Sequence, residues 1–222
     1  MADFWLKFWE YLPQFLPILL WAALTTIQVT LGALALALTL GMGIALMRIA
    51  RSRLLRWPAL VYIDVLRGTP ALVQLFILYF GLADLGIEFS PINAAILGLG
   101  INGAAYVAEI YRAGIEAIQR GQWEAALALG LTPVNTMRYI VLPQALRLML
   151  PPLGNYAIGL LKDTAIISAI AAPEVMFEAR RLVQATFLSN QIYLLCAAIY
   201  LALTVPLSRL VRRLEKAKDA WR

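Results

Sequence analysis

The chain is a series of long apolar runs separated by short polar interruptions. The apolar runs cover residues 16–47, 57–82, 91–117, 153–172 and 190–210. A helix needs roughly 20 apolar residues to cross a bilayer, and a helix satisfies its own backbone hydrogen bonds there. The pattern therefore predicts an all-α, polytopic membrane protein with about five transmembrane helices, which form a single transmembrane domain over residues 1–222.

Shorter patterns lie between and before the runs. Residues 3–15 carry aromatic side chains at helical spacing, which predicts an interfacial helix on the membrane surface. Residues 138–150 predict an oblique helix that ends at the Pro151–Pro152 pair. Residues 173–189 are amphipathic and predict a helix at the outer surface, either a plain surface helix or a docking face for a substrate-binding protein.

Composition supports the membrane class. Hydrophobic residues make up 62% of the chain and charged residues 14%, against roughly 25% charged in soluble domains. The net charge of +6 is concentrated after the first run and at the C-terminus, so it indicates orientation rather than nucleic-acid binding. This bias predicts an external N-terminus and a cytoplasmic C-terminus. One cysteine and no histidine give no disulfide framework and predict no metal site.

A polar break interrupts the second run. Pro70 lacks a backbone donor and disfavours helix at Thr69. Non-helical backbone at membrane depth is tolerated where it is buried in protein or lines a cavity. A substrate pathway and an elbow at the membrane surface, with Asp64 paired to Arg67, both fit this pattern. The pathway candidates here are Arg67, Gly68, Thr69 and Gln74.

Ionisable residues also occur inside two other runs. Lys162 and Asp163 are adjacent, point about 100° apart on a helix, and cost several kcal/mol at mid-depth. A cavity and an interhelical bridge both explain them, and the cavity is favoured, which adds Lys162, Asp163 and Thr164 as pathway candidates. Polar residues of the third run share a helix face with one another. The predicted structural ion cluster is Asp64, Glu109, Arg112 and Glu116.

A signature with fixed spacing occupies residues 120–143. It comprises Glu124, Ala125 and Ala126, then Gly130 after three residues, and Ile140, Leu142 and Pro143 after nine more. Gly130 can take the left-handed conformation that ends a helix, and Thr132 followed by Pro133 predicts the start of the next. Glu124 is expected in the first helical turn, where the dipole favours a carboxylate.

This signature resembles the EAA loop of the membrane subunits of ATP-binding cassette (ABC) importers. The stretches RGTPALVQLFILYFGL, AAYVAEIYRAGIEAIQRGQWEAA and GLLKDTAIIS are similar to those of polar amino acid permeases. The resemblance implies a type I importer permease fold in the bacterial cytoplasmic (inner) membrane. It also implies that the seven signature residues couple the chain to an ATPase.

The resemblance further implies partners. These are two ABC ATPase subunits, a second permease chain as homodimer or heterodimer, and an extracytoplasmic substrate-binding protein, besides membrane lipid. The chain itself is not expected to be an enzyme or to hold a cofactor, because ATP and Mg²⁺ belong to the ATPase. The sequence has no G-x-x-x-x-G-K-[ST] phosphate loop, in agreement with this expectation.

The expected substrate is a polar amino acid. The Asp163 carboxylate disfavours an acidic side chain, so glutamine or a basic amino acid is favoured. Two alternatives stay open at this point: an ABC permease for another small solute, and an ATP-independent channel or membrane scaffold.

Overall fold

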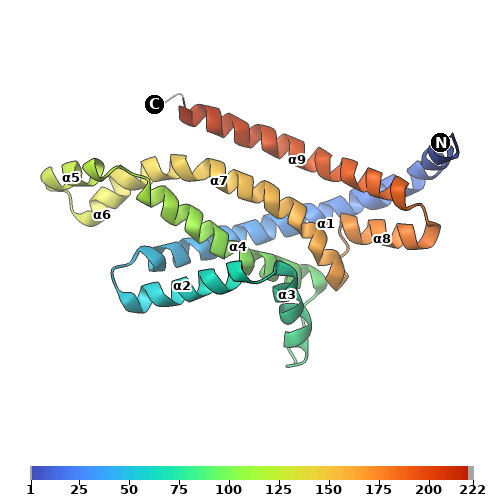
Figure 1. Cartoon of the computed structure of the whole chain (residues 1–222), viewed down its shortest axis with the longest axis horizontal. Coiled ribbons are helices and arrows are strands. Elements are labelled where there is room, and N and C mark those ends of the chain that lie inside the picture. The colour runs from blue at the N-terminus through green and yellow to red at the C-terminus, as the bar shows by residue number, and fades with distance from the viewer. Residues whose placement is uncertain (1, 220–222) are drawn as a thin grey trace.

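The computed structural model describes the backbone of residues 2–219; the side chains of residues 2–5, 7, 214 and 216–219 lie outside this description. Every described element is a helix, as the apolar pattern predicts (Figure 1). In chain order these are α1 (Ala2–Ile49), α2 (Arg53–Gly68), α3 (Ala71–Phe76), the π-helix η1 (Ile77–Gly81), α4 (Pro91–Glu116), α5 (Arg120–Ala128), α6 (Pro133–Asn135), the π-helix η2 (Thr136–Val141), α7 (Leu142–Asp163), the 3₁₀-helix η3 (Thr164–Ile170), α8 (Val175–Thr186) and α9 (Ser189–Asp219).

Several of these helices can cross a membrane. Within the described residues, Phe8–Ile49 of α1, α4, and Ser189–Arg213 of α9 are long and apolar enough. The helix α2 and the α3–η1 segment meet at an angle of 105°, and they make a fourth span if the bent pair is counted as one. The helix α7, which contains most of the fourth predicted run, does not meet the same criterion. The three helices of the described chain that can each cross a membrane confirm the predicted polytopic architecture.

Two helices are longer than the sequence pattern predicts. The helix α1 continues through Pro13 and Pro17, so residues 3–15 and the first span form one helix rather than two. Its N-terminal half is held by Phe15 and Leu19, which are buried against α8 and α9. Likewise, α7 continues through Pro151 and Pro152, contrary to our prediction. Tightly packed neighbours can stabilise a helix across a proline.

Small residues bring the helices at the centre close together. The helix α1 runs along α4, and their contact is lined by buried alanines such as Ala33 and Ala104. A Cβ atom on Gly100 would lie 2.7 Å from a side-chain carbon of Leu36, so only glycine fits at this position. Small residues that allow close backbone approach are typical of helix contacts in membranes.

The elements sort into two ends of an elongated molecule. In Figure 1, α5 and α6 extend from one end, where α4 finishes and α7 starts, and α8 lies near the other end. The helix α3 turns away from the long axis at the end of α2. We call the end that carries α5 and α6 the coupling end.

Candidate coupling segment and substrate groove

The coupling segment, defined as residues 120–143, turns sharply at Gly130. The backbone N–H groups of Gly130 and Leu131 donate to the carbonyl oxygens of Leu127 and Ala126, at 3.0 and 3.1 Å. Gly130 has φ = +79°, the left-handed value predicted for it. This paired bonding closes the end of α5 and reverses the chain.

The next helix starts as predicted, whereas Glu124 lies elsewhere than predicted. The hydroxyl of Thr132 accepts a hydrogen bond from the backbone N–H of Asn135 at 3.3 Å, and Pro133 is the first helical residue. Because α5 begins at Arg120, Glu124 is its fifth residue and not part of its first turn. The dipole argument for Glu124 is therefore wrong, and its exposed carboxylate is free to meet a partner.

The coupling segment exposes apolar side chains beside its small residues. Leu129 is 83% exposed, and Leu127 and Tyr139 are also exposed. Ala126 alone of the first three signature residues is buried, in the helix α5 that packs on η2. Glu124, Ala125, Gly130 and Pro143 are exposed, and Ile140 and Leu142 are half-buried. A patch of this kind outside the spans is typical of a protein interface.

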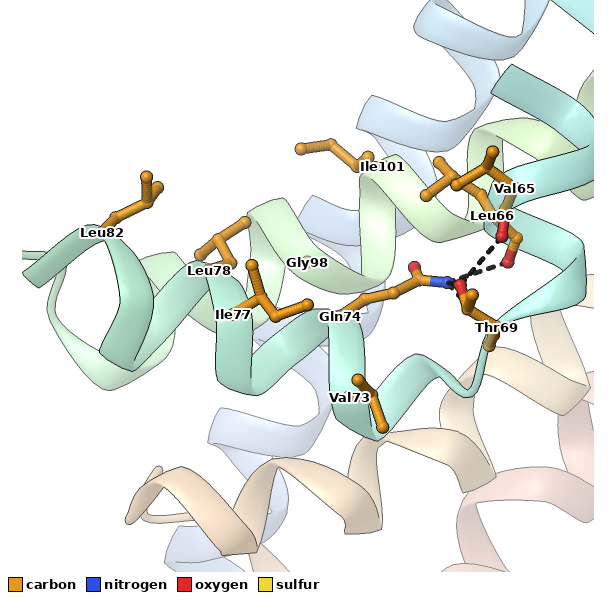
Figure 2. Close-up of a pocket in the computed structure, with 10 residues that line it drawn as sticks. All are labelled: Val65, Leu66, Thr69, Val73, Gln74, Ile77, Leu78, Leu82, Gly98 and Ile101. Atoms are coloured by element: carbon orange, nitrogen blue, oxygen red, sulfur yellow. Dashed lines mark hydrogen bonds between the residues drawn. The ribbon is translucent and has the colours of Figure 1, made fainter. Parts of the chain in front are cut away.

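The polar break lies at Thr69 and Pro70, between α2 and α3, and is bridged by side chains. Figure 2 shows Gln74 reaching back from α3, where its Nε2 atom donates to the carbonyl of Leu66 at 2.9 Å and to Thr69 Oγ1 at 2.7 Å. Asn102 of α4 donates to the same carbonyl and to Gln74 Oε1, both at 3.0 Å. The freed carbonyl of Leu66 is therefore satisfied within the protein, as a break at membrane depth requires.

An apolar pocket of about 390 Å³ lies under this bend (Figure 2). Its lining residues are Val65, Leu66, Thr69, Val73, Gln74, Ile77, Leu78, Leu82, Gly98 and Ile101. Gln74 uses its amide on Leu66 and Thr69, so this pocket offers little charge or hydrogen bonding to a polar solute. Gln74 thus supports the bend.

Two further pockets lie in line along the groove between α4 and α7. The pocket farther from the coupling end, here called the outer pocket, has a volume of about 430 Å³. It is lined by Ala71, Leu72, Leu99, Asn102, Tyr106, Tyr156, Gly159, Leu160, Asp163 and Ile166. The inner pocket has a volume of about 730 Å³ and is lined by Arg67, Tyr106, Glu109, Ile110, Arg112, Ala113, Gly114, Ala117, Leu148, Pro152 and Tyr156.

The three pathway candidates predicted in the fourth apolar run, Lys162, Asp163 and Thr164, lie in different surroundings. Asp163 lines the outer pocket and, within the described part of the chain, takes part in no hydrogen bond or ion pair. Lys162 is exposed but lines none of the three pockets. Thr164 is fully buried, its hydroxyl donates to the carbonyl of Leu161 at 2.7 Å, and it lines none of the three pockets.

The pathway candidates predicted in the second apolar run also lie in different places. Arg67 lines the inner pocket, and its guanidinium carbon lies 5.3 Å from the ring centroid of Tyr106. Gly68 ends α2 and has open space around it. Thr69 lines the apolar pocket and donates to the carbonyl of Val65 at 2.8 Å.

Charged residues near the coupling end form one cluster on α4 and α1. Arg112 donates to both carboxylate oxygens of Glu109 at 3.0 to 3.1 Å from Nε, and it also pairs with Glu116. Arg48 joins from α1, with its Nε 3.9 Å from Glu109. The sequence reasoning missed Arg48, which lies 61 positions from Glu109.

Asp64 does not belong to this cluster. It is exposed on α2, and no ion pair within residues 2–219 joins it to Arg67. The predicted Asp64–Arg67 pair therefore does not form, because Arg67 turns to the ring of Tyr106 instead.

The comparisons with known proteins identify the family. Residues 37–219 match the family of binding-protein-dependent transport system inner membrane components. The chain belongs to this family. It is accordingly a multi-pass membrane subunit of an ABC importer, and ATP hydrolysis takes place on a separate subunit. The resemblance drawn from the coupling segment is thus confirmed.

Two curated relatives support the same family. The chain is 43% identical over 178 residues to a probable amino-acid ABC transporter permease protein, YckA of Bacillus subtilis (strain 168), covering 80% of this chain and 79% of the relative. It is 37% identical over 210 residues to the glutamine transport system permease protein GlnP of Escherichia coli (strain K12), covering 94% and 96%.

Solved structures share the fold. A crystal structure of an amino acid ABC transporter with histidines has a TM-score of 0.90 at 37% identity and covers 94% of this chain and 97% of that chain. An inward-facing structure of the MetNI methionine ABC transporter has a TM-score of 0.71 at 20% identity, covering 90% and 97%, a likeness that shows the fold alone. The type I importer permease fold is therefore confirmed.

Proposed function

We propose that this permease subunit moves a polar amino acid, either glutamine or a basic amino acid, along the groove between α4 and α7. The similarity to a glutamine permease over 94% of the chain supports an amino acid as cargo. The outer pocket supports the charge preference, because Asp163 is the acidic residue among its lining residues. An ammonium or a cationic side chain is the group that this carboxylate would bind.

The unpaired state of Asp163 is the observation that carries this proposal. Asp163 is the last residue of α7 and is followed directly by the 3₁₀-helix η3. The adjacent Lys162 acts on this carboxylate through its charge, but it forms no ion pair with it in the described chain and lines none of the three pockets. In a membrane-spanning domain, the carboxylate therefore has no cationic partner inside the outer pocket. A cationic group of the substrate supplies this partner. Arg67 in the inner pocket offers the opposite charge to a substrate carboxylate.

The proposed assembly contains two ATPase subunits, a second permease chain and an extracytoplasmic substrate-binding protein. The exposed apolar patch of the coupling segment suits one ATPase subunit per permease. The amphipathic helix α8 lies near the opposite end, where its Arg180 and Arg181 are exposed to a docking protein. The basic residues after the first span and near the C-terminus support an external N-terminus and a cytoplasmic C-terminus. ATP and Mg²⁺ are bound by the ATPase, and this chain holds no cofactor.

The test is uptake of labelled amino acids by the complete importer in proteoliposomes. Asp163→Asn should lower ATP-driven uptake about tenfold, a loss of about 1.4 kcal/mol of stabilisation, and leave basal ATP hydrolysis within about twofold. The matched control is Asp64→Asn, because Asp64 lines none of the three pockets. Unchanged uptake by Asp163→Asn would remove Asp163 from the pathway.

Competition by unlabelled amino acids identifies the cargo. Unlabelled glutamine, arginine and lysine are added in excess, each in turn, and glutamate serves as the comparison. Inhibition by one of the first three supports the proposal, whereas inhibition by glutamate alone contradicts the charge preference drawn from Asp163.

A further inference from the structure

Two tyrosines line both pockets of the groove. Tyr106 of α4 and Tyr156 of α7 occur in the linings of the outer and the inner pocket alike, and no other residue is common to the two linings. Along α4, the residues unique to the inner pocket start at Glu109, and those unique to the outer pocket end at Asn102. The tyrosines therefore stand at the boundary between the two pockets.

The two rings form a stack that continues onto a third helix. Their centroids lie 6.3 Å apart with an interplanar angle of 18°. Arg67 covers Tyr106, with its guanidinium carbon 5.3 Å from the ring centroid. Stacked rings attract each other, and so do a guanidinium and a ring face. Side chains of α2, α4 and α7 are thus held together at this one level of the groove.

A glycine sets the position of Tyr156. A Cβ atom on Gly103 would lie 2.0 Å from the Tyr156 hydroxyl oxygen and 3.0 Å from the Cβ of Ala37. The hydroxyl occupies the space that a side chain at Gly103 would fill, between α1 and α4. The ring of Tyr156 is therefore placed by packing on both of these helices, and it will shift when α7 moves relative to them.

The two pockets differ in charge on either side of the tyrosines. The outer pocket contains Asp163, and the inner pocket contains Arg67 and Arg112 with Glu109. A zwitterionic substrate bound at Asp163 meets the stacked pair of rings before it reaches the arginines.

We propose that Tyr106 and Tyr156 form a partition across the groove, which closes the outer pocket from the inner pocket until α7 moves relative to α1 and α4. This inference rests on the proposed transport route and adds the residues that interrupt it. Tyr156 forms the movable part, because it belongs to α7 while its hydroxyl packs at Gly103 of α4, so a shift of α7 displaces it. Tyr106 forms the part stabilised by Arg67.

Cysteine accessibility tests the partition without reference to the cargo. Reporter cysteines are Gly159→Cys in the outer pocket, where a Cβ atom has open space, and Ala113→Cys in the inner pocket, which is exposed. Cys196 is buried and gives the background rate. A membrane-impermeant methanethiosulfonate reagent is added to the complete importer from the membrane face that carries α5, without nucleotide.

With both tyrosines present, the cysteine in the outer pocket should react more slowly with the reagent than the cysteine in the inner pocket. We expect Gly159→Cys to react about tenfold more slowly than Ala113→Cys, which corresponds to a barrier of about 1.4 kcal/mol. Adding Tyr156→Ala or Tyr106→Ala should bring the two rates within about twofold, a residual difference of about 0.4 kcal/mol. Tyr156→Phe keeps the ring and should preserve the difference.

Several results would overturn the partition. Equal rates for the two reporters with both tyrosines present would show that nothing separates the pockets. A tenfold difference that survives both alanine variants would assign the barrier to another part of the groove. Tyr106→Ala keeps the test decisive if Tyr156→Ala fails to fold, since Tyr106 is 38% exposed. Amino acid uptake is measured separately, so a failure of the proposed cargo leaves this result interpretable.

Discussion

The coupling segment and the substrate groove are built in opposite ways. The coupling segment is continuous in sequence, and its turn depends on neighbours such as Gly130 and Thr132. The groove draws its key side chains from α2, α4 and α7, so Arg67 and Tyr156 are 89 positions apart. The coupling segment exposes apolar side chains at one end of the molecule, whereas the groove lies between helices of the membrane domain.

Because of this difference, the two regions should tolerate different amino-acid substitutions. A single backbone position decides the shape of the coupling segment, because Gly130 adopts its left-handed conformation without the steric cost that a residue with a Cβ atom carries there. In the groove, several contacts of modest energy together hold the side chains in place. Single changes in the coupling segment should therefore have large effects on transport. Changes to side chains that support the bend between α2 and α3 should act mainly on stability.

The largest effect is expected from Gly130→Val. A β-branched residue at φ = +79° is strained by about 1–2 kcal/mol or more, and relief of that strain breaks the paired hydrogen bonds that close α5. We expect the ATPase subunit that co-purifies with the permease to fall about tenfold, equivalent to about 1.4 kcal/mol. Densitometry of the purified complex measures this amount.

Gly121→Ala is the matched control in the same segment. A Cβ atom on Gly121 meets nothing within 4 Å, and alanine favours the helix α5 in which this residue lies. Retention of the ATPase by both variants would show that the turn at Gly130 does not determine the interface.

A middle-sized effect is expected from Gln74→Leu, which acts on the bend between α2 and α3. The substitution removes the hydrogen bonds of Gln74 to Leu66 and Thr69 and the acceptor for Asn102. Each lost hydrogen bond contributes about 0.5–1.5 kcal/mol, so the melting temperature of the importer in detergent should fall measurably. The control is Gln184→Leu, which changes an exposed glutamine on α8. An equal melting temperature for both variants would mean that the network is dispensable.

The smallest effect concerns Glu174, which precedes α8 and lies outside the membrane-spanning helices. Burial raises the pKa of its carboxyl above the ordinary value of 4.5, although hydrogen bonds from the Met176 and Phe177 N–H groups and the Tyr200 hydroxyl oppose this rise. The folded protein therefore holds this proton more tightly than the unfolded chain. Its contribution to stability is fully present below the unfolded-state pKa and is lost as the pH rises through the folded-state pKa.

Variants at this site measure the effect through thermal unfolding at several pH values. The melting temperature of wild type relative to Glu174→Gln should be highest in acid and should decrease as the pH rises. Tyr200→Phe keeps the carboxyl but removes a hydrogen bond to its ionised form, so the decrease should move to higher pH. A pH-independent difference between wild type and Glu174→Gln would contradict the raised pKa.

The sequence predicts local features of this fold well. The left-handed Gly130, the cap at Thr132 and the break before Pro70 follow from the properties of single residues and their neighbours, and the structure contains all three. The helix α8 likewise lies within the predicted amphipathic segment.

Long-range contacts could not be predicted in the same way. The Tyr106–Tyr156 stack and the bridge from Asn102 to Gln74 join residues that are 50 and 28 positions apart, and no periodicity connects them. Local rules also failed where packing overrode them. Pro151 and Pro152 stay inside α7, and Thr164 is buried beside an exposed Asp163.

The central claim is that the coupling segment links ATP hydrolysis on a partner to movement of solute along the groove. Simultaneous measurement of ATP hydrolysis and amino acid uptake by the complete importer in sealed proteoliposomes tests it most directly. We predict uptake that requires ATP and stops when Gly130→Val detaches the ATPase. Uptake or conductance that proceeds without nucleotide, and that Gly130→Val leaves unchanged, would contradict the account and indicate a passive pathway.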